Sequence, residues 1–352
     1  MSSASPFPAL SRTGRRVSVR RVVGTTQGRP LFSDVLGLLE RTDAEAVVVR
    51  RADGTAVTLE PASISAARLI PPPSVSSSGR AGAVHALATS VAELERIAAL
   101  GWLGLENGQV GGWLLRAAGG FTGRANSALP VGDPGHPLPE AVDAVVAWYA
   151  ERGLPPRFQV PLPYADDVDA ELAGRGWSGG DGALVLVADL GPLLARPGSG
   201  RPVPPAGEVV RIDTLPDASW LDAYHYRGGR LPPHAREVVE RGACLGFASV
   251  RAADGSVLAI ARGSLDEGWL GVTAVEVEPS ARRRGLAGVV LRELAGWAVG
   301  LGGLSCYLQV SPANAPALAL YRAAGFVDHH WYQYRSPADR PDSETGIPNP
   351  GQ

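Results

Sequence analysis

The stretch that decides the fold is LGVTAVEVEPSARRRGLA, which runs from Leu270 to Ala287. It opens with a run of β-forming residues, and Pro279 ends that strand because proline has no backbone N–H for the ladder. A helix is expected over residues 289–299. A turn of small residues between a strand and a helix leaves backbone N–H groups and the positive end of the helix dipole free for an anion. The stretch therefore predicts a phosphate-binding turn.

The arginines and the small residues of this turn both favour binding of a phosphate. The arginines at 282–284 supply positive charge, while Gly285 and Ala287 let the backbone approach a phosphate closely. A solvated arginine run capping an ordinary strand–helix unit remains the alternative. Two other phosphate sites fit less well: the glycines at 300–303 precede a strand rather than a helix, and a P-loop needs a lysine. The chain has no lysine, so all 33 of its basic residues are arginine.

A second stretch, VSPANAPALALYRAAGF, follows a predicted strand and spans Val310 to Phe326. Together the two stretches resemble the GNAT superfamily of acetyl-CoA-dependent N-acetyltransferases. That family's phosphate turn is (Q/R)-x-x-G-x-(G/A), and its later element is N-x-x-A-x-x-x-Y-x-x-x-G-F. Both occur here in the family's order and with its usual separation. The matching residues are Arg282, Gly285 and Ala287 for the turn, and Asn314, Ala317, Tyr321, Gly325 and Phe326 for the later element.

The resemblance implies a role for each matched position. The strand would pair with the pantetheine arm of acetyl-CoA, the turn would hold the pyrophosphate, and Asn314 would also bind the cofactor. Tyr321 would protonate the departing thiolate, which a phenol can do without a metal; packing of its ring on the helix face is the alternative. The implied cofactor-binding residues are Val275, Glu276, Val277, Arg282, Arg283, Arg284, Gly285, Leu286, Ala287, Gly288, Asn314 and Tyr321.

The group that accepts the amine proton is harder to place. Relatives often carry a glutamate eight residues before the proline of this strand, where the present chain has Gly271. Glu276 is the nearest carboxylate on the same strand, with Glu267 and Glu278 near its ends. A bulge, common in this strand of the family, would decide which face Glu276 presents. Glu276 is therefore the candidate base or water-positioning residue, and a structural carboxylate is the alternative.

The acceptor pocket is expected near the start of the catalytic block, in the stretch from Trp220 to Pro233. Arg227 and Arg230 could grip carboxylates with paired hydrogen bonds, and Tyr224 and Tyr226 could form walls; surface arginines and packed tyrosines are the alternative. The neighbouring histidines at 329–330 more readily end a helix–strand connection than bind a metal, because no third ligand has suitable spacing. No metal is expected.

The chain contains two copies of one plan. In the first, Trp148 on a helix precedes Gln159 on a strand by 11 residues, and 17 more lead to Gly176. The second copy has Trp297, Gln309 and Gly325 at separations of 12 and 16 residues. Matching order and matching lengths indicate a duplication. The first copy lacks the phosphate turn and the tyrosine, and is therefore expected to be a degenerate half. Its stretches 111–116 and 121–127 either rim a shared cleft or only pack.

The N-terminal part predicts a separate small β unit. Strands are expected at 17–19, 36–39, 46–50 and 55–59, and Asp53-Gly54 between the last two is a hairpin signal. The arrangement resembles an SH3-like barrel. The predicted fold class is α+β, with tandem GNAT-like mixed-sheet domains, the first degenerate, behind that barrel. The predicted boundaries are a disordered tail at 1–13, the barrel at 14–72, the degenerate domain at 80–195, the catalytic domain at 206–335 and a disordered tail at 336–352.

Composition restricts the function classes. The net charge of −2 gives no overall field for nucleic acid or anionic membrane. No stretch of about 18 apolar residues predicts a membrane helix, and the N-terminus lacks a signal-peptide pattern, so a cytoplasmic protein is expected. Cys244 and Cys306 are too few for a disulfide framework and are expected to be reduced.

These features predict an enzyme that moves an acetyl group from acetyl-CoA to a primary amine by direct attack. The whole layout resembles an actinobacterial group of GNAT proteins, some assigned as N-acetylglutamate synthases and others labelled histone-acetyltransferase-like. A small amino acid such as glutamate is the favoured acceptor, because two carboxylates would suit two arginines. The alternatives are acetylation of a protein or peptide amine, and a non-catalytic acyl-CoA sensor or scaffold. The sequence does not reveal the oligomeric state.

Overall fold

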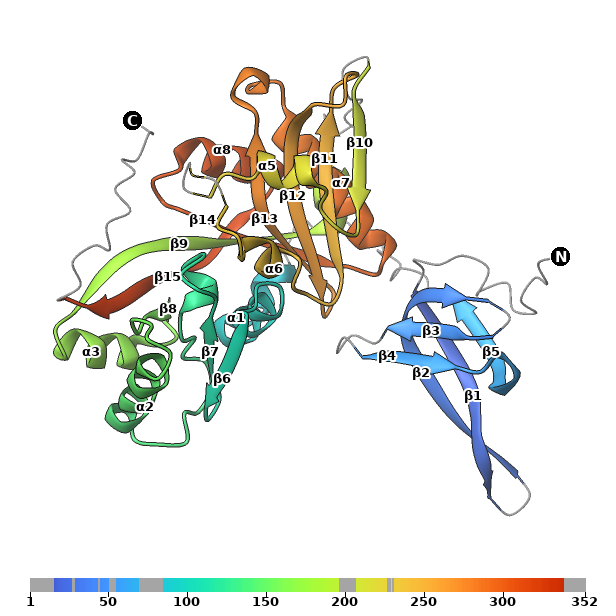
Figure 1. Cartoon of the computed structure of the whole chain (residues 1–352), viewed down its shortest axis with the longest axis horizontal. Helices are drawn as coiled ribbons and strands as arrows, with labels where there is room; N and C mark the ends of the chain where they lie inside the picture. Colours follow the sequence, from blue (N-terminus) through green and yellow to red (C-terminus); the bar gives the residue numbers. More distant parts are fainter. Residues whose placement is uncertain are drawn as a thin grey trace.

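The structure is a computed structural model of the whole chain, shown in Figure 1. It describes residues 16–26, 29–43, 45–50, 55–69, 85–195, 207–226, 229 and 231–338. The predicted tail at 1–13, the predicted linkers at 71–79 and 194–205, apart from residues 194 and 195, and the tail beyond 338 lie outside these residues.

The N-terminal unit is a five-stranded antiparallel sheet in the order β4-β3-β2-β1-β5. Valine and leucine side chains that alternate along its strands form its core. The four predicted strands correspond to β1 to β4, although β3 and β4 each begin one residue later than predicted. Strand β3 pairs with β4 as the hairpin signal predicts; the turn at 51–54 lies outside the described residues. The SH3-like assignment stays a prediction. The strands are β1 Arg16–Thr26, β2 Arg29–Thr42, β3 Val47–Arg50, β4 Ala56–Leu59 and β5 Ile64–Leu69, with a 3-10 turn at Pro61–Ser63.

The rest of the described chain is organised around one mixed sheet of eight strands, in the order β10-β11-β12-β13-β14-β9-β15-β8. Among its paired strands only β13 and β14 run parallel. The strands are β8 Phe158–Leu162, β9 Trp177–Asp189, β10 Val209–Asp213, β11 Leu245–Arg251, β12 Val257–Asp266, β13 Trp269–Val277, β14 Ser305–Val310 and β15 Val327–Pro337. A separate hairpin is formed by β6 Glu106–Val110 and β7 Trp113–Ala117.

The two predicted blocks exchange their last strands. Strand β9 of the first block pairs with β14 of the second, with Leu186 opposite Leu308. Strand β15 of the second block pairs with β8 of the first, with Gln333 opposite Val160. Figure 1 shows β9 and β15 side by side as a long curved ribbon. The exchange covers the edge that β14 would otherwise expose, and it joins both blocks into one sheet.

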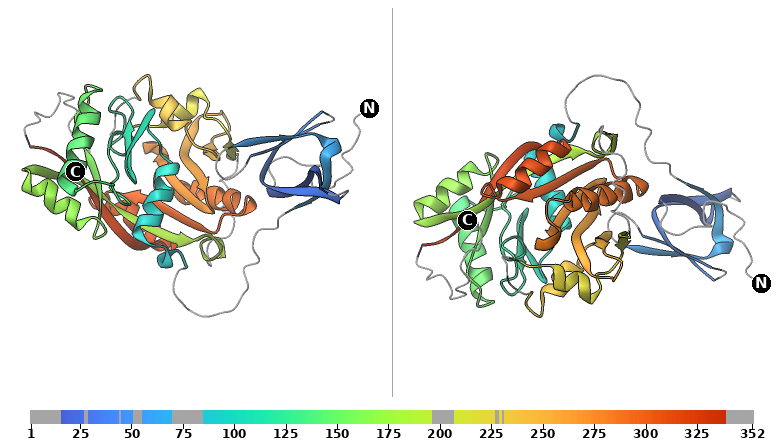
Figure 2. Two further views of the ribbon diagram at one scale, coloured as in Figure 1. Left: turned by 90° about the horizontal axis from the view of Figure 1, so that it is seen from below. Right: turned by 90° about the horizontal axis from the view of Figure 1, so that it is seen from above.

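Helices cover both faces of this sheet (Figure 2). In β11 and β12, Ala248 and Ala261 pack under α7, whereas their neighbours Phe247 and Ile260 face α5 and α6. This follows from the alternation of side chains along a strand. The helices are α1 Val91–Leu100, α2 Leu138–Ala150, α3 Asp166–Gly174, α4 Leu190–Ala195, α5 Ala218–Ala223, α6 Ala235–Val239, α7 Leu286–Gly300 and α8 Ala315–Ala324; 3-10 turns lie at His85–Ala88, Arg124–Asn126 and Pro279–Ala281.

The order of elements agrees with the repeat seen in the sequence. The first block has α2-β8-α3-β9, and the second has α7-β14-α8-β15. A duplication remains our interpretation of this match. One boundary was misplaced: Ser336 and Pro337, predicted to begin the disordered tail, belong to β15 and pair with Ser178 and Trp177 of β9.

Candidate active site

The site lies where β13 and β14 separate. Their ladder runs from Trp269 opposite Ser305 to Val272 opposite Leu308 and ends there. Immediately afterwards β13 has a bulge at Ala274, whose φ is +51°, and its register with β12 shifts by one residue. The bulge that is common in this strand of the family is thus present here. The strands form a fork, and the backbone groups of β13 that face the fork beyond Val272 are left without ladder partners.

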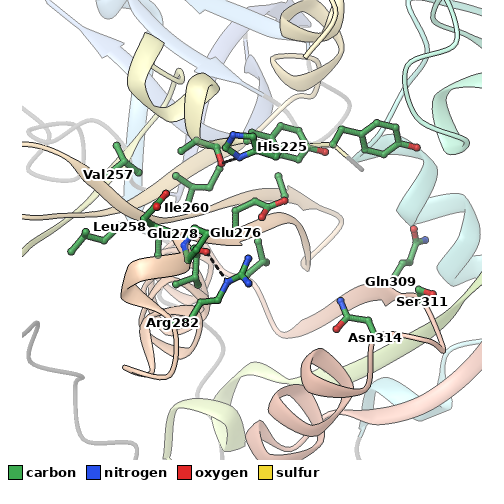
Figure 3. A pocket seen from close by; sticks show the side chains of 18 of the residues that line it. His225, Val257, Leu258, Ile260, Glu276, Glu278, Arg282, Gln309, Ser311 and Asn314 are labelled. Atoms are coloured by element: carbon green, nitrogen blue, oxygen red, sulfur yellow. Dashed lines mark hydrogen bonds between the residues drawn. The ribbon is translucent and has the colours of Figure 1, made fainter. Parts of the chain in front are cut away.

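A cavity of about 1310 Å³ opens at this fork. It exceeds the usual ~300–1,000 Å³ of a small-molecule pocket, so it has room for a cofactor arm and an acceptor. In Figure 3, Glu276 and Arg282 lie on one side of the opening, and Gln309 and Asn314 lie on the other. The polar and aromatic side chains on its walls are those of Asp181, Tyr224, His225, Tyr226, Glu276, Glu278, Arg282, Gln309, Ser311, Asn314 and Tyr334.

The predicted phosphate turn leads directly into α7. Gly285 is the N-cap residue with a φ of +79°, a conformation that favours glycine. No side chain caps this end of the helix. The backbone N–H groups of Leu286, Ala287 and Gly288 therefore point out of the helix N-terminus and have no partners within the helix. A Cβ built on Gly285 would meet no atom within 4 Å. The turn therefore has both the geometry and the space for an anion.

Its three arginines differ in their surroundings. Arg282 borders the cavity, and its Nε donates weakly to the carbonyl of Val277 at 3.5 Å. Arg284 forms an ion pair with Glu208. The sequence showed no acidic neighbour within the turn itself, but this distant carboxylate reduces the positive charge that Arg284 can offer. Arg283 is exposed. Arg282 and Arg283 are thus the more available cations.

Asn314 borders the cavity and is also the N-cap of α8. Its Oδ1 accepts a hydrogen bond from the Ala317 backbone N–H at 3.1 Å. The amide NH₂ makes no hydrogen bond within the described residues and remains able to donate to a ligand. Asn314 therefore has a structural function in addition to the binding role that the resemblance implies.

Tyr321 is buried beside the fork rather than in the cavity wall. Its ring packs edge-on against Phe326 in the apolar core beneath β14, and it is absent from the side chains that border the cavity. Burial raises the pKa of its phenol to about 12. Its hydroxyl makes no hydrogen bond to any described residue. The packing expected as the alternative is thus observed, and the hydroxyl stays available as a donor.

Glu276 follows the bulge and lies opposite Ile260 of β12. It borders the cavity and makes no hydrogen bond or ion pair within the described part of the chain. Burial raises its pKa, an effect that His225 and Arg282 partly oppose. A carboxylate with a raised pKa is a better proton acceptor near neutral pH.

The structure explains why position 271 has no room for the glutamate that relatives carry there. A Cβ at Gly271 would lie 2.3 Å from the Tyr307 hydroxyl and 2.9 Å from Ser264 Oγ. The tyrosine fills the space that a longer side chain would need. Of the other two carboxylates considered, Glu267 forms an ion pair with Arg96, and Glu278 is exposed at the end of the strand.

Two of the four residues predicted to bind the acceptor border the cavity. Tyr224 is buried and Tyr226 half-buried, and both border the cavity. Arg227 and Arg230 lie outside the described residues. Of the first block, the stretch 121–127 packs against these walls: the Phe121 ring is 5.3 Å from that of Tyr226, and a Cβ on Gly123 would lie 2.8 Å from Tyr334.

Sequence reasoning assigned no role to five polar or aromatic residues of the cavity: His225, Gln309, Ser311, Asp181 and Tyr334. His225 stood in the quoted acceptor stretch without a role. Gln309 served only as a marker of the repeat. Asp181 and Tyr334 reach the site through the exchanged strands β9 and β15, and no local signal marks them.

The paired histidines belong to a buried network away from the cavity. His330 Nε2 lies 2.8 Å from Glu95 Oε1, and His329 Nε2 lies 2.9 Å from the Thr89 carbonyl oxygen. Cys244 and Cys306 are free. Within the described ranges, no three His, Cys, Asp or Glu side chains are grouped as a metal site would require.

Comparison with known proteins identifies the family. The family described as "Probable histone acetyltransferase Rv0428c C-terminal" matches residues 88–335, which span both halves of the eight-stranded sheet. The chain belongs to this family. It is a GNAT-type acetyltransferase, and GNAT acetyltransferases use acetyl-CoA.

Two curated relatives and one solved structure agree with this assignment. "Probable histone acetyltransferase Rv0428c" of Mycobacterium tuberculosis (strain ATCC 25618 / H37Rv) is 32% identical over 335 residues, covering 91% of this chain and 94% of the relative. "Uncharacterized N-acetyltransferase YobR" of Bacillus subtilis (strain 168) is 26% identical over 253 residues, covering 70% and 98%. A GCN5-related N-acetyltransferase from Kribbella flavida has a TM-score of 0.50 at 18% identity, covering 73% of this acetyltransferase and 95% of that chain. This likeness concerns the fold.

None of the helices in the described part of this acetyltransferase has the length and apolar character needed to cross a membrane.

Proposed function

We propose that this acetyltransferase moves the acetyl group of acetyl-CoA to the primary amine of a cationic acceptor by direct attack. The observation that carries the proposal is the fork, where free backbone groups of β13 and the unpaired carboxylate of Glu276 meet one cavity. Arg282, at the start of the turn that leads to the uncapped N-terminus of α7, borders the same cavity. The free edge of β13 over Val275–Val277 suits the amides of the pantetheine arm, and the turn 282–288 suits the pyrophosphate.

In the proposed reaction the neutral amine nitrogen attacks the thioester carbon, a C–N bond forms and the C–S bond breaks. Glu276 takes the proton that the amine loses, directly or through a water molecule. Tyr321 donates its phenolic proton to the departing sulfur. The products are an N-acetylated acceptor and CoA with a free thiol.

The charges around the cavity favour a cationic acceptor over glutamate. Three carboxylates border it, those of Glu276, Glu278 and Asp181, whereas Arg282 at the phosphate turn is the single arginine among its described walls. Tyrosine faces, which attract cations, complete the acceptor side. The arginines that would suit glutamate lie outside the described residues. A lysine side chain or a polyamine fits this arrangement, and a relative's name, probable histone acetyltransferase, points to a similar acceptor.

A thiol-release assay tests the acceptor class. With acetyl-CoA and equal concentrations of a polyamine, a lysine-containing basic peptide and glutamate, we expect turnover with the cationic amines and little with glutamate. Mass spectrometry of the product should show the acetyl group on a primary amine. Turnover with glutamate alone would overturn the cationic acceptor, and release of thiol without an acetylated product would overturn amine transfer.

Glu276→Gln should lower kcat by about a hundredfold near neutral pH, the lower end of the range for a positioned base. Because the wild-type carboxylate must be ionised, wild-type activity should fall as the pH drops through its raised pKa. The variant should lack this fall in activity at low pH, and it should recover activity at high pH, where more of the amine is already neutral. The pH profiles of kcat measure this.

Glu278→Gln is the matched control, since this carboxylate borders the same cavity but is exposed at the strand's end. It should keep the wild-type pH dependence of kcat, even where loss of its charge raises the KM of a cationic acceptor. Loss of stability in Glu276→Gln without any recovery at high pH would show that Glu276 is structural.

A further inference from the structure

We propose that both halves of the chain build the acceptor subsite, with Gln309 holding the reacting amine at the fork and Asp181 holding a second positive charge of the acceptor. This rests on the proposed function and specifies its acceptor as an amine with at least two positive charges. Gln309 lies on β14 of the catalytic half. Asp181 lies on β9, the strand that the first half contributes to the shared sheet.

Gln309 comes one residue after the last rung of the β13–β14 ladder. Both of its amide atoms, Oε1 and Nε2, are buried and have no hydrogen-bond partner among the described residues. In Figure 3 its side chain extends into the opening, across from Glu276. A buried amide without partners is costly, and such groups in native proteins usually have a function or an absent partner.

The repeat provides an internal comparison. Gln159, the matching residue of the first half, is also buried, but its amide is fully used: Oε1 accepts from Arg116 and Nε2 donates to Glu95, each at 2.9 Å. The glutamine thus has partners in the degenerate half and lacks them in the half with the phosphate turn. This difference indicates that a ligand supplies the partners of Gln309.

The amide chemistry fits the proposed reaction. Oε1 can accept an N–H of the attacking amine, and Nε2–H can donate to the oxygen of the thioester carbonyl. The oxygen and nitrogen of an amide are attached to one carbon, as are the oxygen and the amine nitrogen of the tetrahedral intermediate. One side chain can therefore contact both atoms as the bond forms, which stabilises developing charge.

Asp181 supplies charge at the rim of the same cavity. Its carboxylate is exposed and forms no ion pair or hydrogen bond in the described chain. Tyr334, which borders the cavity from the neighbouring strand β15, places an aromatic ring on this side. An unpaired carboxylate at the cavity rim attracts a cation through its charge. The Tyr334 ring already has the Arg157 guanidinium 5.5 Å from its centroid, so the charge of Asp181 is the main attraction at this position. Of the other two carboxylates that border the cavity, Glu276 is needed for the reacting amine, and Glu278 directly precedes the proline that leads into the phosphate turn, so Asp181 is left for a second cation.

The experiment uses the full chain and compares three kinds of acceptor: a monoamine, a diamine with the same number of carbons, and longer diamines. Asp181→Asn should lower kcat/KM for the best diamine about three- to fivefold, as expected for a partly exposed ion pair, and change the monoamine by less than about twofold. The diamine preference of the wild type should weaken with added salt. Gln309→Met should lower kcat/KM for both acceptors about ten- to a hundredfold, with the KM for acetyl-CoA nearly unchanged.

Two controls separate these effects from general damage. Asp328→Asn removes an exposed carboxylate of β15 that is paired with Arg322, and should leave both acceptors unchanged. Thr273→Val removes another unpartnered buried group at the fork that does not border the cavity, and should retain activity. Because Met and Val replace unsatisfied polar groups with similar shapes, thermal unfolding should show no loss of stability.

The outcomes distinguish this proposal from the proposed function. Wild-type protein that acetylates neither amine contradicts the proposed function. Wild-type protein that acetylates amines without preferring a diamine, or an Asp181→Asn protein that keeps the preference, overturns the second-charge site. A Gln309→Met protein with wild-type kcat/KM overturns the glutamine's role. Calorimetric binding of the diamine to the CoA complex gives a readout independent of turnover: wild type should bind it, and equal affinity in Asp181→Asn would also overturn the site.

Discussion

Gly285→Glu is expected to abolish CoA binding while leaving the protein folded. Gly285 is the left-handed N-cap of α7, and its missing side chain leaves open space in front of the uncapped N–H groups of residues 286–288. A glutamate would place a carboxylate where the pyrophosphate must sit, and it would accept the hydrogen bonds meant for the phosphate oxygens. We expect at least a hundredfold weaker binding, or about 3 kcal/mol, measured by calorimetry with CoA.

Two further variants separate charge from backbone strain. Gly285→Ala tests the positive φ alone, which costs about 1 kcal/mol of stability for an ordinary residue, and should bind CoA far better than the glutamate variant. Gly296→Glu puts the same substitution at an exposed position of the same helix, where a Cβ also meets nothing within 4 Å. It should bind CoA normally. A folded Gly285→Glu protein with wild-type affinity would contradict the phosphate assignment.

Tyr321→Phe should lower turnover by about a hundredfold or more, as expected for loss of a positioned general acid, with little change in acetyl-CoA binding. The ring remains, so its packing against Phe326 is kept. Only the hydroxyl is lost, and with it the proton for the departing thiolate. Because burial holds the pKa of this phenol near 12, the group stays protonated at working pH and should add no titration of its own below that value. Single-turnover rates measure the chemical step.

Tyr164→Phe is a suitable control, because this exposed tyrosine donates no proton in the proposed reaction and lies outside the cavity walls. It should keep wild-type rates. Near wild-type single-turnover rates in Tyr321→Phe would show that packing is the whole role of this ring, in agreement with its place in the core rather than in the cavity wall.

The sequence by itself was sufficient for the features that depend on neighbours along the chain. A proline that ends a strand, a glycine that needs a positive φ and an alternation of apolar residues act within a few positions. The strand–turn–helix around Gly285 and the helix that begins after Asn314 were therefore predictable, and so were four of the five strands of the N-terminal sheet; β5 was not predicted. The family resemblance raised the possibility of a bulge in β13 without locating it, and the structure places it at Ala274.

Only the tertiary structure decided what depends on contacts between distant segments. Hydrophobic patterning shows that β9 and β15 are strands, but pairing partners are chosen by the packing of the whole sheet, so the exchange between the halves left no local trace. That exchange brings Asp181 and Tyr334 to the cavity. Likewise, Glu208 pairs with Arg284 from 76 residues away, and Tyr307 excludes a side chain at Gly271. Among the described residues, Gln309 also lacks the hydrogen-bond partners that its counterpart Gln159 has. The sequence located the turn proposed to bind the cofactor because a turn is local; the proposed acceptor subsite combines residues of both halves, and therefore required the fold.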